Sequence, residues 1–464
     1  RGQVYTATPK SLRKSLHGSI ANLLLADPAD ADDLETAWHC VRSGRVDEAR
    51  PRIISGAQAC IERGALHEAE LGLRSGLYLL NGEDRLSGMM LIAEVLQEQG
   101  QWRDTLGVLA EIQDELAQPT TAPRWRQISA ALSARSRSRL ESIPAFEVGE
   151  VVERLLRGLP SDADNKTAAL TASACAATVA YERDADLAAT TLTRLDQIRP
   201  SDWPLMELGR WLLSRAILSY YAGRINECTE AISEAATRLK VEVNPSSLAA
   251  EILLGLGALG CAKGEYAEAV THLMRAADLA KRIGNDTLYC SATTNLALCH
   301  GRLKHFEAQI AWAKLALANG RFQGAYNRLQ CLYNLARGHA ALGHEGEALN
   351  AVSALAAASL DSAPVYVDQA RYLFCAEANA LLARSGQAER FSVLGVEGRN
   401  AKLHSASFAG LYARGLVRAQ HHVGDAEVRT RLEALIKKMG SYDLPDQEEI
   451  REAYLRLFGK TCDT

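Results

Sequence analysis

The chain alternates between long stretches rich in Ala and Leu and short turns rich in Gly and polar residues. Ala and Leu are the best helix formers, so each long stretch predicts a helix. No alternating apolar–polar pattern typical of a β-strand extends for any length. The turns recur through the second half of the chain at Gly223, Gly264, Gly343, Gly386 and Gly424, with Lys304 and approximately Asp184 in the two places without glycine.

The recurrence has a nearly constant period. Between positions 184 and 424 the steps are 39, 41, 40, 39, 43 and 38 residues. A fixed period near 40, with two helices joined at a glycine in each unit, is typical of an α-solenoid. Glycine ends the first helix of a unit in a backbone conformation that other residues resist, and small residues let the two helices approach closely. We therefore predict an all-α right-handed superhelix.

Three units carry the pattern most clearly: "LGALGCAKGEYAEAV" (256–270), "LALCHGRLKHFEAQI" (296–310) and "LARGHAALGHEGEAL" (335–349). They resemble tetratricopeptide repeats, whose paired helices follow an L-G-x-x-Y, G-x-Y-x-x-A pattern. Leu256 and Gly257 match the leucine and small positions, and Tyr266 and Ala269 match the later aromatic and alanine positions. The resemblance implies that Tyr266 and Ala269 hold helices together and do not catalyse.

Some positions depart from the repeat pattern. Glu345 replaces the aromatic residue, Gln309 replaces an alanine, and the period exceeds 34 residues. Longer helices and loops such as "RIGNDTLYC" (282–290) resemble the long-period subtype of bacterial regulators.

The first eighty residues add a more specific resemblance. Leu16-His17, Ile20-Ala21, Ala37 with His39, and the Gly64-Ala65 and Glu68-Ala69 pairs match the stretch that follows the ATPase module in bacterial STAND regulators, including MalT-like, LuxR-type activators. In that family the repeats act as a sensor and oligomerisation arm that controls an upstream ATPase switch. The chain begins at Arg1 without a methionine, and we therefore expect it to be part of a longer protein. The resemblance implies a nucleotide-binding module before Arg1.

Four segments are expected from these patterns. Residues 1–80 link to the upstream module and begin the repeats, and residues 81–165 form irregular helical repeats. Within them, Pro144 and Pro160 interrupt the stretch 139–166 and are expected to shift the superhelix locally. Residues 166–440 form the regular repeats, and residues 441–464 form a C-terminal capping helix and tail.

Composition and charge reduce the range of functions that the chain is expected to have. The 464 residues are 47% hydrophobic but only 6% aromatic, which suits thin, closely packed helices. A net charge of -4 gives no electrostatic footprint for nucleic acid, and no run of eighteen uncharged apolar residues could span a membrane. Ten cysteines are scattered singly. We expect those in helical stretches to be small buried hydrophobes in a reducing cytoplasm: Cys175, Cys228, Cys261, Cys299, Cys331 and Cys375.

Sequence motifs for catalysis or metal binding are weak. "FGKT" (458–461) resembles the end of a phosphate loop, but Tyr454 stands where the first glycine is needed. "HEAEL" (67–71) and "HEGEA" (344–348) lack the second histidine of a zinc-protease helix, and both read as helix starts. We expect no catalytic residue, no metal and no cofactor, and therefore no enzyme.

A ligand is expected in the concave groove, which the first helix of each tetratricopeptide unit lines. The register of the family places Glu251, Leu254, Thr294 and His421 there. It also gives the candidate ligand residues, namely Arg210, Tyr220, Tyr221, Arg302, Tyr333, Arg337, Arg384, Arg414 and Arg418. Arginine with tyrosine suits carboxylates, phosphates or sugar faces. The alternative is that several of these arginines pair with an acidic residue of the next unit.

Two functions remain open at this point. The first is the sensor arm of a STAND-type regulator, which binds a small ligand, peptide or protein and controls a nucleotide switch. The second is a stand-alone tetratricopeptide scaffold or peptide receptor. In both, the partner is a protein or peptide, or a small anionic or sugar ligand. Neither nucleic acid nor membrane is bound directly, and oligomerisation would involve the full-length protein.

Overall fold

The computed structural model describes residues 5, 8–27, 32–159, 163–198, 202–319, 324–358 and 365–382, with six single positions beyond them. Throughout these residues the secondary structure is helical and contains no strand, as the sequence predicts. The helices of the first part are α2 (Lys10–Ala26), α3 (Asp33–Ser43), α4 (Val46–Glu62), α5 (Leu66–Gly76), η1 (Leu77–Leu79), α6 (Gly82–Glu98), α7 (Trp102–Glu111), α8 (Gln113–Leu116), α9 (Pro123–Arg139), η2 (Ala145–Glu147) and α10 (Val148–Gly158).

The second part consists of regular helix pairs. They are α11 (Asn165–Glu182) with α12 (Ala185–Leu195), α13 (Leu205–Tyr221) with α14 (Ile225–Leu239), α15 (Ser247–Lys263) with α16 (Tyr266–Ile283), α17 (Asp286–Arg302) with α18 (Phe306–Ala318), α19 (Ala325–Ala341) with α20 (Glu345–Ala356), and α21 (Val365–Leu381). Their first helices begin at residues 165, 205, 247, 286, 325 and 365, which are 39 to 42 residues apart. The predicted period is therefore confirmed for this part of the chain.

The turns inside the pairs have the backbone conformation that the glycine pattern predicts. Gly264 has φ 79° and closes α15 with hydrogen bonds to the last carbonyls of that helix. Lys304 occupies the equivalent turn with φ 62°, and Arg183, the residue before Asp184, has φ 58°. The left-handed conformation is thus set by the geometry of the turn, and a non-glycine residue adopts it at a cost.

Small residues hold the paired helices close together. A methyl group added to Gly257 on α15 would lie 2.4 Å from the Cγ atom of Leu273 on α16, which is too near for any side chain. Ala269, one turn along α16, is fully buried. The leucine-small and alanine positions of the repeat therefore act as packing positions, as the tetratricopeptide resemblance implies.

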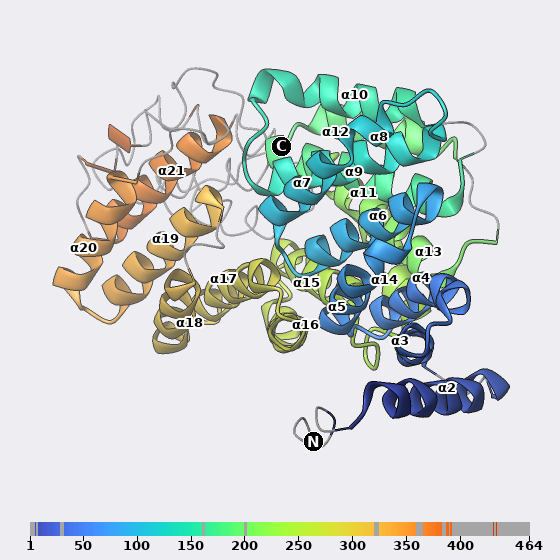
Figure 1. Ribbon diagram of the computed structural model, residues 1–464. Helices are drawn as coiled ribbons and strands as arrows, with labels where there is room; N and C mark the ends of the chain where they lie inside the picture. The colour runs from blue at the N-terminus through green and yellow to red at the C-terminus, as the bar shows by residue number, and fades with distance from the viewer. Residues whose placement is uncertain are drawn as a thin grey trace.

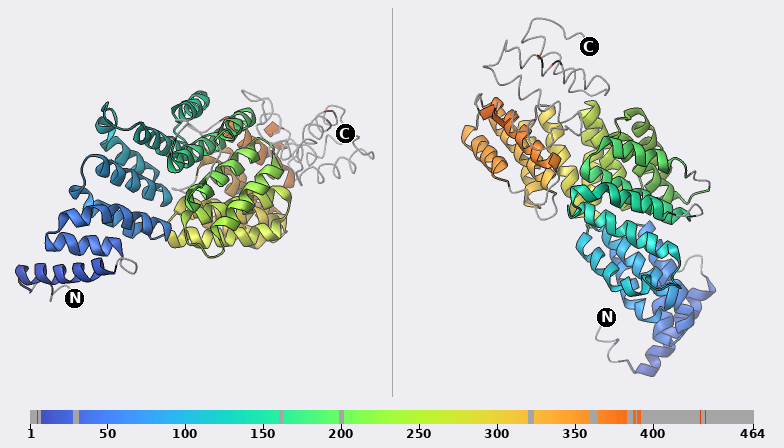
Figure 2. Two further views of the ribbon diagram at one scale, coloured as in Figure 1. Left: turned by 90° about the vertical axis from the view of Figure 1, so that its right-hand side faces the viewer. Right: turned by 90° about the horizontal axis from the view of Figure 1, so that it is seen from above.

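The solenoid curves until its later helices meet its earlier ones (Figures 1 and 2). The Asn285 side-chain amide donates to the Glu98 carbonyl at 2.6 Å, 187 residues away in sequence. Trp102 Nε1 donates to Thr287 Oγ1 at 3.2 Å, a separation of 185 residues, and the backbone N–H of Ala325 donates to Glu141 Oε1 at 2.9 Å, a separation of 184 residues. One superhelical turn therefore closes after a constant stretch of chain.

The irregular stretch after α9 positions part of this closure. The chain leaves α9, passes through η2 and enters α10, and Glu141 lies in the connection with φ 53°.

Helix α2 lies at the N-terminal end of the molecule, away from α15 to α21 (Figure 2). Among the helices that the structure describes, none is long and apolar enough to cross a membrane.

Candidate ligand cavity

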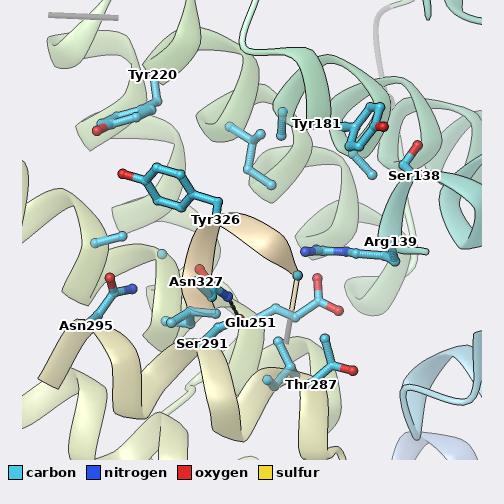
Figure 3. Close-up of a pocket in the computed structure, with 18 of the residues that line it drawn as sticks. Ser138, Arg139, Tyr181, Tyr220, Glu251, Thr287, Ser291, Asn295, Tyr326 and Asn327 are labelled. Atoms are coloured by element: carbon cyan, nitrogen blue, oxygen red, sulfur yellow. Dashed lines mark hydrogen bonds between the residues drawn. The ribbon is translucent and has the colours of Figure 1, made fainter. Parts of the chain in front are cut away.

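An open cavity of about 1240 Å³ lies inside the superhelical turn (Figure 3). The first helices of the regular pairs, α11, α13, α15, α17 and α19, supply most of its wall. The C-terminal end of α9 and the turn between α6 and α7 complete it. Small-molecule sites typically have volumes of about 300 to 1,000 Å³, so this cavity has room for a whole small ligand or a short stretch of peptide.

Buried ion pairs bridge the interior of the superhelix. Arg135 on α9 and Glu251 on α15 approach to 2.6 Å, with side chains only 5% and 14% exposed. Arg210 on α13 and Glu98 on α6 approach to 2.9 Å, and both are similarly buried. Each pair joins helices more than 100 residues apart in sequence. A buried charge of this kind is stable only while its partner is present.

Glu251 is held ionised by a group of arginines. Burial alone would raise the pKa of its carboxyl, but the cations of Arg135, Arg139 and Arg210 lower it, and the net pKa lies below the usual value. The wall of the cavity at α15 therefore carries a fixed negative charge that three positive charges surround.

Arg139, the last residue of α9, points into the cavity (Figure 3). The exposed part of its side chain faces the cavity. The protein atoms around the cavity desolvate the guanidinium, which lowers its pKa. The side chain lies over the ring of Trp102 at 5.9 Å, and no described residue forms an ion pair with it. The carboxylate of Glu251 favours the charged form of Arg139, but Glu251 forms its ion pair with Arg135, at 2.6 Å. Arg139 is therefore a cation on the cavity wall whose charge no described residue neutralises in an ion pair.

Aromatic and amide side chains surround this cation. The guanidinium of Arg183 lies 3.9 Å from the ring centre of Tyr326, which fixes that ring at the start of α19. Tyr220 lines the wall nearby, and the Asn327 side-chain amide donates to Ser291 Oγ at 3.3 Å (Figure 3). The lining near Arg139 thus offers rings for stacking and amides for hydrogen bonds.

The structure places the sequence-predicted ligand residues in three groups. Tyr220, Tyr221, Arg302 and Tyr333 lie on the cavity wall, together with Glu251 and Leu254. Arg210, Arg337 and Thr294 lie outside that wall: Arg210 is paired with Glu98, and Thr294 donates to the Cys290 carbonyl at 2.8 Å. Arg384, Arg414, Arg418 and His421 lie outside the described residues, as does the "FGKT" segment.

Tyr333 and Tyr266 have surroundings that the sequence did not predict. Tyr333 is 1% exposed and its ring stacks on Phe374, with ring centres 4.8 Å apart, so it supports the wall from behind. Tyr266, expected to serve packing alone, also lines the cavity.

Three cavity residues are not among those predicted from the sequence, namely Arg139, Tyr326 and Asn295. Arg139 falls in the stretch that was interpreted only as an interruption of the repeats. The register that places groove residues on the first helices also predicts Arg139 and Tyr326, if it is applied to α9 and to the start of α19. Within the described residues, no three His, Cys, Asp or Glu side chains gather in a group that could hold a metal ion.

Glu182 lies at the end of α11, beside the cavity wall, and the burial of its carboxyl can be tested. Burial and the neighbouring Asp184 raise its pKa from the usual 4.5 to about 7. The native state therefore keeps a proton that the unfolded chain has lost, and stability falls as pH rises from 4.5 to about 7. Glu182→Gln should increase the free energy of unfolding by about 1 to 3 kcal/mol at pH 8, and by much less at pH 4.5. Urea denaturation at the two pH values measures this, and an equal effect at both would contradict the assignment.

Comparisons with known proteins agree with this fold. A family model described as anaphase-promoting complex subunit 5 matches residues 259–321 and 319–359. No curated protein sequence matches the chain. The structure of a Rap protein complexed with Competence and Sporulation Factor is 13% identical, with a TM-score of 0.57, over 77% of this chain and 99% of that one. This likeness shows that the chain has the tetratricopeptide-like solenoid fold.

Two further solved structures align with lower scores. The human IFIT1 dimer with m7Gppp-AAAA is 13% identical, with a TM-score of 0.47, over 96% of this chain and 95% of that one. A signal-transduction ATPase with numerous domains and a tetratricopeptide repeat sensor, from Pyrococcus horikoshii, is 16% identical, with a TM-score of 0.39, over 82% of this chain and 51% of that one.

Proposed function

We propose that the chain is a non-enzymatic receptor arm that binds an anionic ligand, or the carboxylate of a peptide, in its central cavity. The observation that carries the proposal is Arg139, a cation without an ion-pair partner among the described residues, on the wall of an open cavity of about 1240 Å³. Guanidinium binds a carboxylate or phosphate through two parallel hydrogen bonds, and low surrounding dielectric strengthens them.

The other residues of the wall complete such a site. Tyr220 and Tyr326 offer ring faces, and Asn295 and Asn327 offer amide groups that pair with peptide groups of a ligand. In the proposal Glu251 does not meet the anion, because Arg135 holds it. The Rap protein, which has the same fold, was solved with Competence and Sporulation Factor bound. That complex is consistent with a solenoid that acts as a receptor.

The finer part of the proposal is a regulatory role. Residues 12–80 resemble the stretch after the ATPase module of STAND regulators, and we propose that ligand binding in the cavity biases an upstream nucleotide switch in the cytoplasm. A ligand can do so only if it binds two states of the solenoid with different affinity. The contacts that close the superhelical turn, such as Asn285 to Glu98, provide a boundary where two states could differ.

The binding test uses chemically defined probes. Inorganic phosphate, citrate and a pool of pentapeptides with free carboxyl ends are titrated into the wild type by calorimetry, with the amidated pool as a matched probe. We expect at least one anionic probe to bind. Arg139→Gln should weaken it by about tenfold to a hundredfold, since a hydrogen bond to a charged group contributes about 1.5 to 3 kcal/mol.

Arg154 on α10 supplies the control. It is 67% exposed and pairs with Glu150 on its own helix, so Arg154→Gln removes the same charge far from the cavity. Affinity in this variant should match the wild type. The proposal fails if no probe binds, or if Arg139→Gln and Arg154→Gln bind equally well.

A further inference from the structure

Two thiols face each other across neighbouring repeats. Cys261 on α15 and Cys299 on α17 have their Sγ atoms 2.9 Å apart, although 38 residues separate them in sequence. A disulfide bond is about 2.0 Å long, so the two sulfurs need to move together by less than about 1 Å to form one. Both cysteines are free thiols in this structure.

The two sulfurs differ in accessibility. The sequence predicts that every cysteine of the helical stretches is buried. This is wrong for Cys261, which is half-buried and lines the cavity. Cys299 is fully buried behind it. A small oxidant that enters the cavity therefore meets Cys261 first, and Cys299 is positioned to react with the oxidised product.

We propose that Cys261 and Cys299 form a reversible redox site, in which hydrogen peroxide oxidises Cys261 and Cys299 closes a disulfide between α15 and α17. In the first step the Cys261 sulfur attacks one peroxide oxygen, the O–O bond breaks, and a sulfenic acid and one water form. In the second step the Cys299 sulfur displaces the sulfenic oxygen as a second water. The two thiols lose two electrons, and the peroxide gains them.

The electrostatic surroundings set the rate of the first step. The hydrogen bond with Cys299 and burial raise the pKa of the Cys261 thiol well above its usual value, while the Arg302 cation opposes them. Because the thiolate is the nucleophile, oxidation at neutral pH is slow and accelerates as pH rises. The resulting bond would link two first helices of adjacent repeats, both of which line the cavity.

The test treats the folded, reduced chain with hydrogen peroxide and measures its intact mass. We expect a product lighter by two hydrogen atoms that dithiothreitol returns to the starting mass. Trypsin should release residues 241–263 joined to residues 283–302, with fragment ions that place the bond on Cys299 and not on Cys290. The oxidised form should also unfold at a higher temperature than the reduced form.

Cys228 provides the matched control, since it is buried, lines the same cavity and makes no hydrogen bond to another sulfur among the described residues. Cys228→Ser should still form the linked peptides, whereas Cys261→Ser and Cys299→Ser should not. The proposal is overturned if the wild type gains oxygen atoms without linking, stays unmodified, or links peptides in Cys261→Ser. The linked peptides from the wild type decide it if a serine variant fails to fold.

Discussion

Replacing Glu251 with glutamine should lower the free energy of unfolding by about 3 to 5 kcal/mol. The carboxylate pairs with buried Arg135 at 2.6 Å, and Arg139 and Arg210 also lower its pKa. Glutamine keeps the shape but removes a negative charge that acts on all three cations, so their mutual repulsion and desolvation are less fully offset. Urea denaturation at pH 7 measures the loss, and Glu251→Gln should also shrink the folded fraction on mild heating.

The pH dependence of this effect has a definite sign. The folded pKa of Glu251 lies below its usual 4.5, so its stabilising contribution is present above that value and is lost as pH falls through the folded pKa. The difference between wild type and Glu251→Gln should therefore diminish in acid. Glu234, which is 48% exposed and pairs with Arg238 on the same helix, is the control. Glu234→Gln should change stability by about 0.5 kcal/mol or less, and equal losses in the two variants would contradict the argument.

Asn285→Ala should destabilise the fold by about 2 to 4 kcal/mol, because the side chain has two functions. Its oxygen accepts from the Leu288 N–H at 2.9 Å and caps α17, and its amide donates to the Glu98 carbonyl at 2.6 Å. Asn285 is 1% exposed, so the loss leaves the buried Leu288 N–H without its acceptor, and the Glu98 carbonyl keeps only the longer hydrogen bond from Ser247 Oγ at 3.3 Å. Small-angle scattering should also show a larger radius of gyration, because the bond to Glu98 is one of the contacts that close the superhelical turn.

Two variants separate the cap from the closure. Asn285→Ser keeps a capping oxygen but is too short to reach Glu98, so it should expand the molecule while it retains most of the cap. Asp164 caps α11 through the Thr167 N–H at 2.8 Å, and Asp164→Ala should cost about 1 kcal/mol without expansion. If Asn285→Ala costs no more than Asp164→Ala and leaves the radius unchanged, the closure does not depend on Asn285.

The receptor proposal and the redox proposal can fail independently. The first depends on Arg139. The second depends on the thiols of Cys261 and Cys299, whose oxidation does not require a ligand. A wild-type chain that binds no anionic probe but forms the disulfide would retain the redox site alone.

The sequence by itself determined the helical units, their period and their turns. Gly264 and Gly343 end helices where the pattern places them, and Gly257 and Ala269 pack where the repeat requires small residues. These features depend on backbone conformation and on side-chain size between neighbouring helices. Both are local, and a single unit of about 40 residues already specifies them.

Only the tertiary structure decided which residues meet inside the superhelix. Small rotations between successive units add up until residues 184 to 187 apart come into contact, and no single unit encodes that sum. This accumulated rotation brings Glu98 to Arg210, so that Arg210, a predicted ligand residue, forms an ion pair instead. The same closure places Arg139, at the edge of an irregular stretch, on the cavity wall, and leaves Cys261 accessible from the cavity. Local pattern fixes the units, and the accumulated geometry of many units fixes the site.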